Sequence, residues 1–336
     1  MKRNKTLLLI ISVLISVLLF LVALAALLSA KKSNAGTPTG SSNTVSSSQP
    51  TQTGTEPTDP TESSDPTPTE PTPPATEPPP PPSEPDAEYI GTLYTREQLE
   101  AMDTKVHEYG SGKATNGKRP PLPVDAQYLY GQYGGNFLAP DNGNIYLTFD
   151  CGYEYYATDE QGNRYRVTER ILDVLKEKDV KAVFFITMSY AQKQPDLVRR
   201  MIDEGHAVGN HSNNHPVMPK QTIDQMVYEV MSVHEYVLEH YNYEMTLFRP
   251  PTGAYSVQSL AVVQSLGYKN VHWSFAYVDW ETDNQPNYNS ALKNVTDCAH
   301  SGAIYLLHAV STTNAAILGD VIDSFRASGY HLELFQ

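Results

Sequence analysis

The stretch Gly205-His-Ala-Val-Gly-Asn-His-Ser-Asn-Asn-His215 carries most of the information about the fold and the chemistry of this chain. Its small, apolar first half predicts a short buried strand, and its second half places two histidines where the strand ends and a turn begins. Two imidazoles four residues apart, one helical turn, can bind one metal ion from the same side. Alone, such a pair is a weak signal that a surface pair on a helix explains equally well.

Apolar runs on both sides of this stretch alternate with amphipathic segments. Strand patterns cover residues 144–150, 182–186, 246–249, 271–274, 303–308 and 331–335, and helix patterns cover 167–178, 195–205, 222–240, 256–266 and 313–327. Repeated strand–helix units predict an α/β fold with parallel strands, as a barrel or a doubly wound sheet. The count of about seven strands is one short of a complete (β/α)8 barrel. Residues 89–140 have weak periodicity, so we expect an N-terminal extension that packs on a barrel of residues 144–336.

The N-terminal part of the chain has the composition of an anchor followed by a spacer. Residues 1–5 are basic, and residues 7–29 form an apolar run long enough to cross a bilayer of about 30 Å, which predicts an uncleaved signal anchor over residues 1–32. The alternative is an atypical signal cut near residues 33–35. Residues 33–88 hold fifteen of the 25 prolines and nine acidic residues but no Lys or Arg, which predicts a disordered linker. Both alternatives export residues 89–336.

Charge and cysteine content narrow the classes of function. The net charge is −14 and no basic cluster occurs in the exported part, so nucleic acid is not an expected partner. Nothing in the sequence indicates a protein partner. The two cysteines, Cys151 and Cys298, could pair in an exported protein. We disfavour that disulfide because Cys151 lies inside a segment rich in polar, chemically competent residues.

Polar side chains follow five of the predicted strands. They are Asp150, His211, Arg249, Asp279 and His308. Each one alone is explained by a capping or loop role. Because parallel strands deliver their carboxyl ends to one rim, where α/β barrels hold their active sites, we expect all five to converge.

These clusters resemble the motifs of a known enzyme family. Thr148-Phe-Asp-Cys-Gly152, His211-Ser-Asn-Asn-His215, Arg249-Pro-Pro-Thr-Gly253, Asp279-Trp280 and Leu306-Leu-His308 are similar, in this order, to the five motifs of the polysaccharide deacetylases, carbohydrate esterase family 4. Residues 148–154, 273–280 and 306–311 resemble the muramic δ-lactam-forming de-N-acetylases of spore-forming bacteria. The resemblance implies a distorted (β/α)7 barrel.

The resemblance also implies roles for the site residues. Amide hydrolysis needs an activated water, a polarised carbonyl and a proton for the leaving amine. The family pattern makes Asp150 the general base, Arg249 its partner, His308 the general acid and Asp279 the partner of His308. It makes the Thr252 backbone N–H the oxyanion donor. His211 and His215 correspond to the family's ligands of one divalent metal ion. Leu306 and Trp280 correspond to residues that line the acetyl pocket and the groove. Tyr153 and Glu154 are candidates for substrate contact.

Cys151 departs from the family pattern, which has Asp at this position, or Asn in the δ-lactam branch. A thiolate binds zinc well, at about 2.3 Å, and a His₂Cys site would favour zinc over harder ions. The alternative is that Cys151 is merely tolerated and that the protein supplies two ligands only.

The sequence therefore predicts a membrane-anchored, metal-dependent N-deacetylase on the cell-wall side of the membrane. Its expected substrate is the peptidoglycan glycan strand, at N-acetylmuramic acid. The alternatives with the same chemistry are N-acetylglucosamine in peptidoglycan or chitin oligomers, and acetylated xylan. The alternative from another class is a catalytically silent glycan-binding module, which the intact Asp150, Arg249 and His308 disfavour.

Overall fold

A computed structural model describes residues 93–122 and 126–336 of the chain. The predicted anchor, residues 1–32, and the predicted linker, residues 33–88, lie outside the described residues. Within the described ranges no helix has the length and apolar character needed to cross a membrane.

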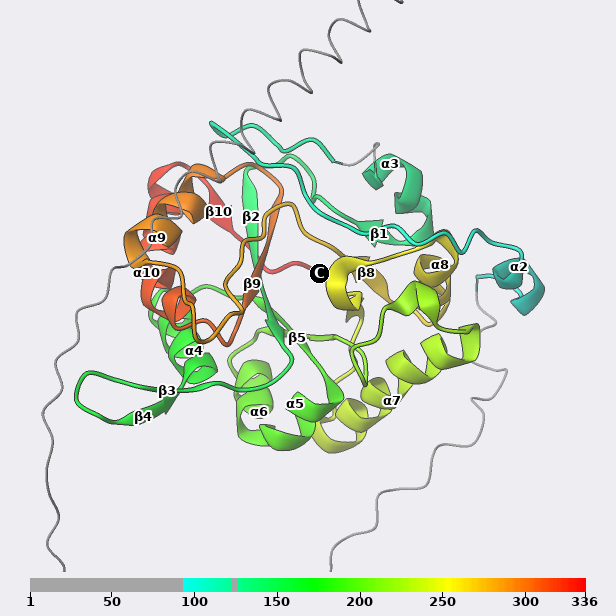
Figure 1. Cartoon of the computed structure of the whole chain (residues 1–336), viewed down its shortest axis with the longest axis horizontal. Helices are drawn as coiled ribbons and strands as arrows, with labels where there is room; N and C mark the ends of the chain where they lie inside the picture. The colour runs from blue at the N-terminus through cyan, green and yellow to red at the C-terminus, as the bar shows by residue number, and fades with distance from the viewer. Residues whose placement is uncertain (1–92, 123–125) are drawn as a thin grey trace, which may run out of the picture. The chain divides into compact units, whose positions relative to one another are not determined.

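A curved sheet of parallel strands forms the centre of the described part of the chain (Figure 1). Its strands are β1 (Gly135–Asn136), β2 (Asn144–Cys151), β5 (Val183–Ile186), β6 (Ala207–Asn210), β7 (Leu247–Phe248), β8 (Lys269–Val271), β9 (Ala303–His308) and β10 (His331–Leu332). Each pairing recorded in this sheet is parallel. The predicted α/β fold with parallel strands is confirmed.

The paired strands form a ring, which a short junction between the segment after β8 and strand β9 completes. We call this junction the seam. From β2 the pairings run through β5, β6 and β7 to β8, while β9 pairs with the other side of β2. The segment that follows β8 then reaches β9. The Ser274 N–H donates to the Ile304 carbonyl at 2.9 Å, and the Leu306 N–H donates to the Phe275 carbonyl at 2.9 Å. A parallel bridge between Phe275 and Tyr305 accompanies these bonds.

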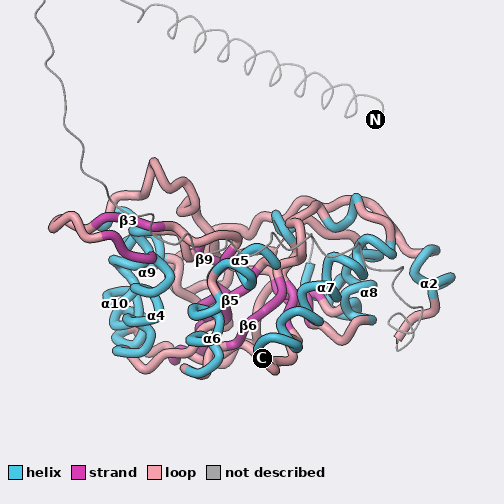
Figure 2. The backbone as a smooth tube through the Cα atoms, turned by 90° about the horizontal axis from the view of Figure 1, so that it is seen from below, coloured by secondary structure: helices cyan, strands magenta, loops and turns pink. Residues whose placement is uncertain are grey.

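Helices cover the outside of the sheet. They are α4 (Val167–Glu177), α5 (Met188–Lys193), α6 (Pro195–Asp203), α7 (Ile223–Tyr241), α8 (Val257–Ser265), α9 (Tyr288–Asp297) and α10 (Thr312–Ala327). Figure 2 shows the strands in the middle, with α4, α9 and α10 toward one side and α7 and α8 toward the other. The helix limits follow local signals, since a capping box at Thr222 starts α7 and the left-handed Asn242 ends it. Short α5 and α9, and the hairpin of β3 (Tyr156–Thr158) and β4 (Arg164–Arg166), were not predicted.

Alternation along β2 separates two apolar layers. Ile145, Leu147 and Phe149 belong to the large core cluster that also contains the buried faces of the helices. Tyr146 belongs to a second cluster, whose members come from several strands and from the C-terminal end: Val183, Phe185, Leu247, Val271, Ile304 and Phe335. The C-terminus lies near the middle of the ring of strands (Figure 1). We therefore read the second cluster as the packed interior of the ring.

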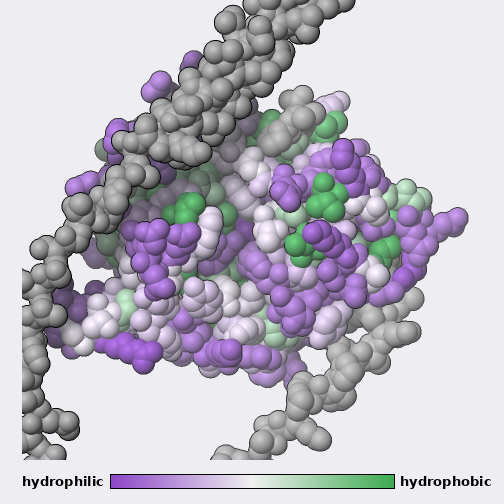
Figure 3. Space-filling model, in the orientation of Figure 1, coloured by the Kyte–Doolittle hydropathy of each residue, from purple (hydrophilic) through white to green (hydrophobic). Residues whose placement is uncertain are grey.

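The N-terminal extension lies against the sheet and α8. Its elements are α2 (Arg96–Glu100), α3 (Ala126–Tyr130) and the 3-10 turn η3 (Gly131–Tyr133), followed by β1. An antiparallel bridge joins His107 to Tyr255, with backbone hydrogen bonds of 2.8 and 3.0 Å. Tyr109 and Phe137 pack with Tyr255 and Trp273 in an aromatic cluster. Figure 3 shows one face of the molecule, where hydrophilic residues predominate and hydrophobic residues form smaller patches.

Candidate active site

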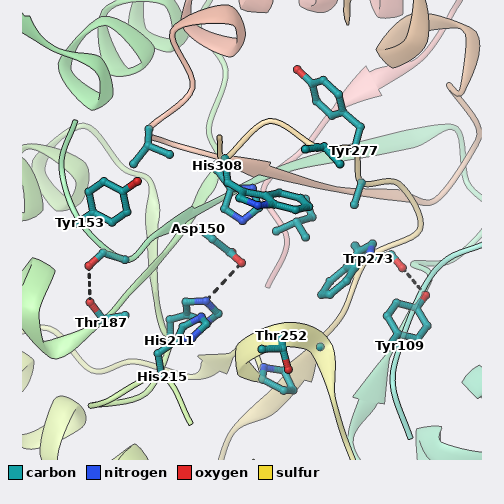
Figure 4. A pocket seen from close by; sticks show the side chains of 18 of the residues that line it. Tyr109, Asp150, Tyr153, Thr187, His211, His215, Thr252, Trp273, Tyr277 and His308 are labelled. Carbon is teal, nitrogen blue, oxygen red and sulfur yellow. Dashed lines mark hydrogen bonds and ion pairs between the residues drawn. The ribbon is translucent and has the colours of Figure 1, made fainter. Parts of the chain in front are cut away.

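A cavity of about 1060 Å³ opens at the carboxyl ends of the strands. Six of the predicted catalytic and metal residues line it or lie directly beneath its floor: Asp150, His211, His215, Arg249, Thr252 and His308. They lie at the carboxyl ends of β2 and β9 and in the loops that follow β6 and β7. Figure 4 shows Asp150 in the centre, with His211 and His215 on one side and His308 on the other. Four of the five residues expected at one rim, Asp150, His211, Arg249 and His308, thus converge there, and the fifth, Asp279, is buried behind His308.

Arg249 holds Asp150 from below. Its Nη1 donates to Asp150 Oδ1 at 2.8 Å, and its other nitrogens donate to the carbonyls of Val271 and His272, each at 3.1 Å. The guanidinium is fully buried and lies over the Phe185 ring, 4.2 Å from its centroid. Burial raises the pKa of Asp150, but the charge and hydrogen bond of Arg249 together with the nearby His211 and His308 outweigh it, and the net shift is downward. Asp150 is therefore an ionised acceptor. Removing Arg249 would leave a buried unpaired carboxylate, at a cost of roughly 3–5 kcal/mol.

The two histidines of the opening motif lie on the loop that follows a strand, as predicted, and not one turn apart on a helix. The chain leaves β6 at Asn210 and does not re-enter a helix until after residue 217. Positive φ angles at Ser212 (68°) and His215 (57°) fold the loop back on itself. The two imidazole centroids are nonetheless 4.8 Å apart, so the loop brings the rings together by another route.

The imidazole of His211 has a fixed orientation. Its Nδ1 donates to the Arg249 carbonyl at 2.9 Å, and its Nε2 lies 3.5 Å from Asp150 Oδ2. Burial lowers the pKa of His211 to about 4 and also lowers the pKa of His215. Both rings are therefore neutral at pH 7, and His211 presents the lone pair of Nε2 toward the cavity. A backbone acceptor on one nitrogen that leaves the other free is the usual arrangement of a metal-binding histidine.

His308 has the opposite electrostatic setting. Its Nδ1 lies 2.6 Å from Asp279 Oδ1, and its backbone N–H donates to Asp279 Oδ2 at 2.9 Å. Burial lowers the pKa of His308, but the hydrogen bond and charge of Asp279 outweigh it, so the net shift is upward. His308 therefore carries a proton at pH values where His211 does not.

Two further residues, which the sequence did not single out, continue the chain of hydrogen bonds that begins with His308 and Asp279. Asn314 of α10 donates through Nδ2 to Asp279 Oδ2 at 2.6 Å. The Tyr277 hydroxyl, from the cavity wall, donates to Asn314 Oδ1. Asn314 follows a helix start rather than a strand, and no local pattern distinguishes it from an ordinary capping-turn residue.

The turn after Arg249 forms the wall opposite His308. Thr252 lines the cavity with a left-handed backbone (φ 61°) inside the 3-10 turn η5 (Pro251–Gly253). Gly253, also left-handed, lies against the Trp273 indole, where an added Cβ would come within 2.3 Å of a ring carbon. Only glycine fits this contact without displacement. The turn is therefore held in one place, with Thr252 facing the cavity (Figure 4).

Three of the four predicted substrate residues line the cavity. They are Tyr153, Trp280 and Leu306. Trp280 is about half exposed, with its ring 5.3 Å from that of His308, while Leu306 is buried in the wall. Glu154 is not among the lining residues. Its carboxylate accepts from the Thr168 N–H and the Tyr190 hydroxyl, each at 3.1 Å, and so caps the start of α4.

Cys151 is not brought to the two histidines. It follows Asp150 on β2, and successive side chains of a strand point to opposite faces. Asp150 faces the cavity, whereas Cys151 is fully buried in the core cluster beneath the helices, where burial raises the pKa of its thiol well above the usual value. In the described ranges, no three His, Cys, Asp or Glu side chains group to hold a metal ion. The predicted His₂Cys ligand set is thus not assembled, and both cysteines are unpaired.

The N-terminal extension supplies part of the cavity wall, which sequence reasoning did not anticipate. Tyr109, Gly110 and Ser111 line the cavity, and the Tyr109 hydroxyl donates to the Trp273 carbonyl at 2.5 Å (Figure 4). The weak periodicity of this region concealed its place in the site.

The arrangement defines a class of protein. The profile of the polysaccharide deacetylase family matches residues 139–271, which include Asp150, both loop histidines and Arg249. The chain belongs to this family of hydrolases, which cleave the amide bond of an acetylated amino sugar.

Individual relatives are similar over most of their length. The peptidoglycan-N-acetylmuramic acid deacetylase PdaA of Bacillus subtilis is 39% identical over 235 residues, which cover 69% of this chain and 86% of that protein. The solved structure of PdaA, described as a family 4 carbohydrate esterase, superimposes with a TM-score of 0.63 at 36% identity and covers 69% of this chain and 96% of that one. A family 4 carbohydrate esterase of Bacillus anthracis gives 0.56 at 36% identity over 70% and 96%.

Proposed function

We propose that this protein is a metal-dependent N-deacetylase of peptidoglycan that removes the acetyl group of N-acetylmuramic acid as acetate. The observation that carries the proposal is the meeting, in one cavity, of an ionised Asp150, two neutral imidazoles and a His308 whose pKa is raised. Amide hydrolysis needs a base, a site for a Lewis acid and an acid at once. This combination favours catalysis over silent glycan binding.

The donor atoms fit a divalent metal such as zinc. His211 and His215 would hold it, because both rings are neutral and His211 presents Nε2 beside an Asp150 oxygen. When bound, the metal would polarise the acetyl carbonyl and lower the pKa of a water molecule to about 7. Two imidazoles are one protein ligand fewer than catalytic zinc sites usually have. We therefore expect weaker metal binding than a three-ligand site provides.

The chain's own residues would carry the proton transfers. Asp150, kept ionised by Arg249, would accept a proton from the attacking water. The Thr252 backbone N–H would donate to the developing oxyanion. His308, kept protonated by Asp279, would give its proton to the leaving amine. The apolar side chains of Leu306 and Trp280 would receive the acetyl methyl group and exclude water.

The choice of sugar rests on the relatives. PdaA, whose name specifies N-acetylmuramic acid, matches over more of this chain than PgdA of Listeria monocytogenes, a peptidoglycan-N-acetylglucosamine deacetylase that is 34% identical over 57% of the chain. Deacetylation of muramic acid would be the step that prepares the δ-lactam. N-acetylglucosamine is the second candidate.

Two matched glycan fragments test the substrate. The protein would be incubated with zinc and with peptidoglycan fragments that carry the acetyl group on muramic acid only or on glucosamine only. We expect acetate release and a mass loss of one acetyl group from the first fragment. Loss from the second fragment alone would transfer the assignment to N-acetylglucosamine. Retention of both acetyl groups by a protein that binds glycan would indicate the silent binding module.

The location and the complete fold are further parts of the proposal. We propose that residues 1–32 anchor the protein in the cell membrane, with residues 33–88 as spacer and the catalytic domain on the cell-wall side, and that the sheet is a distorted (β/α)7 barrel. The basic start and the apolar run support the anchor. Protease treatment of intact protoplasts should remove the catalytic domain and leave a membrane-bound fragment. Recovery of the whole protein from the medium would contradict the anchor.

A further inference from the structure

We propose that Glu229 of α7 is a positioning residue that holds the histidine loop in its metal-binding shape. The inference rests on the metal site proposed above. It concerns a residue outside every motif on which that site was identified.

Both carboxylate oxygens of Glu229 bind the loop between the two histidines. Oε2 accepts from the Asn214 backbone N–H at 2.7 Å, and Oε1 accepts from Asn214 Nδ2 at 2.9 Å. Glu229 is only 6% exposed, and α7 otherwise buries apolar residues along this face. A buried carboxylate is costly unless it is hydrogen-bonded, so the bonds to Asn214 account for its presence there.

The same turn of α7 binds the loop through its backbone. The Glu229 carbonyl accepts from the Asn213 N–H at 3.0 Å, and the Val230 carbonyl accepts from Asn210 Nδ2 at 2.8 Å. Asn210 in turn accepts from the Ser212 N–H at 2.9 Å through Oδ1. One helical turn thus fixes the loop at its start and at its tip.

The loop needs such support because its backbone is strained. Ser212 and His215 both have positive φ, a conformation that costs free energy in residues with a side chain. Within the turn itself, the His215 N–H donates to Ser212 Oγ at 2.9 Å. If the bonds to Glu229 are removed, the strained residues can relax toward negative φ. The two imidazoles, now 4.8 Å apart at their centroids, would then separate.

Three variants of the full-length protein separate geometry from charge. Glu229→Ala removes both bonds to Asn214. Glu229→Gln removes the charge but can keep both bonds, because the Asn214 amide can turn over and accept from the glutamine NH₂ group. Glu239→Gln is the matched control, since Glu239 lies on the same helix with an exposed side chain. Zinc affinity would be measured by competition with a chromophoric chelator, together with the melting temperature of the apo and zinc-bound forms.

We expect Glu229→Ala to weaken zinc binding about 10–100-fold, the usual effect of losing a residue that orients metal ligands. Glu229→Gln should recover most of that loss, and Glu239→Gln should bind zinc as the wild type does. The zinc-induced rise in melting temperature should shrink in Glu229→Ala, whereas a purely structural role would lower both melting temperatures equally.

Each outcome has a separate meaning. Unchanged zinc affinity in Glu229→Ala, with a wild type that binds zinc, would overturn the positioning role and leave the proposed function standing. No zinc binding by the wild type itself would refute the proposed metal site instead. If Glu229→Ala does not fold, Glu229→Gln and Asn214→Ala decide: the proposal requires Asn214→Ala to bind zinc more weakly than Glu229→Gln.

Discussion

The two sides of the cavity use the same side chain in opposite electrical states. On one side, His211 donates to a backbone carbonyl, and burial lowers its pKa to about 4. On the other side, His308 is just as firmly hydrogen-bonded, but its acceptor is the carboxylate of Asp279, and its pKa is raised. Burial acts in the same direction on both rings, so the partner decides the sign.

This difference shows that residue type alone does not assign a role. A neutral imidazole offers a lone pair to a metal ion, and a protonated one offers a proton to a leaving group. The predictions below test whether the two sides are as separate as their hydrogen bonds indicate.

The largest effect on activity should follow from replacing the neutral histidines, His211 and His215. His211→Ala and His215→Ala should each abolish zinc binding and acetate release together, because one imidazole is too small a ligand set. Zinc content by mass spectrometry and acetate release from peptidoglycan would be measured in parallel. His240→Ala, at an exposed position on α7, serves as the control. Full activity in His215→Ala would refute the metal assignment.

Replacing His308, the protonated histidine, should slow the reaction and leave metal binding unchanged. His308→Ala removes the proton donor, and we expect acetate release to fall about 10²–10⁴-fold, the usual contribution of general acid–base catalysis. Zinc affinity should stay at the wild-type value, since His308 is not a proposed ligand. A variant that loses zinc as well would show that the two sides form one unit.

A smaller effect should appear in the pH profile of Asp279→Asn. Activity requires protonated His308, so the alkaline limb of the profile follows the pKa of this residue, which lies above its ordinary value of 6.5. Removing the Asp279 charge leaves burial as the dominant influence and lowers that pKa. The alkaline limb should therefore move to lower pH, as rates measured across the pH range would show. An unmoved limb would mean that another group controls it.

The smallest response is expected at Cys151. Its thiol is buried in the core and its pKa is raised well above the usual value, so alkylating reagents should not label it in the native protein. Removing metal with a chelator should change nothing, whereas unfolding in denaturant should expose it. Rapid labelling of Cys151 only after chelation would bring the thiol back into the metal site.

Sequence reasoning located the elements whose signals are local. A strand occurs at each of the seven predicted places because apolar runs bounded by turn residues mark them, although β8 (Lys269–Val271) shares only Val271 with the predicted residues 271–274. Thr222 and Ser256 act as N-caps close to the predicted helix starts. The six-residue α5 was missed because fewer than two turns give little periodicity, and α9 was missed although it is as long as the predicted α6 and α8. The convergence of Asp150, His211, Arg249 and His308 was predictable because the rule that joins them concerns strand direction alone.

The errors within the site come from orientation and from distant contacts. Cys151, the last residue of β2, points to the core opposite Asp150, as successive side chains of a regular strand do, and this orientation was not read from the sequence. The shape of the loop of residues 211–215 depends on positive φ at two non-glycine residues. No sequence pattern predicts a positive φ at such residues. Three residues make their contacts with partners far along the chain. The separations are 35 residues for Asn314, 164 for Tyr109 and 15 for Glu229, so no local sequence pattern predicts these contacts.

The seam that completes the ring of strands has a consequence for motion. β2 and β9 are joined by six registered residue pairs, whereas the segment after β8 meets β9 through a single bridge at Phe275 and Tyr305. The junction holds fewer pairs than β2 and β9 share, so amide protons at this junction should exchange with solvent before those of β2. Trp273 and Leu306 flank the junction and both line the cavity. Local opening at the junction would therefore reach the cavity wall at these two residues before it reached β2.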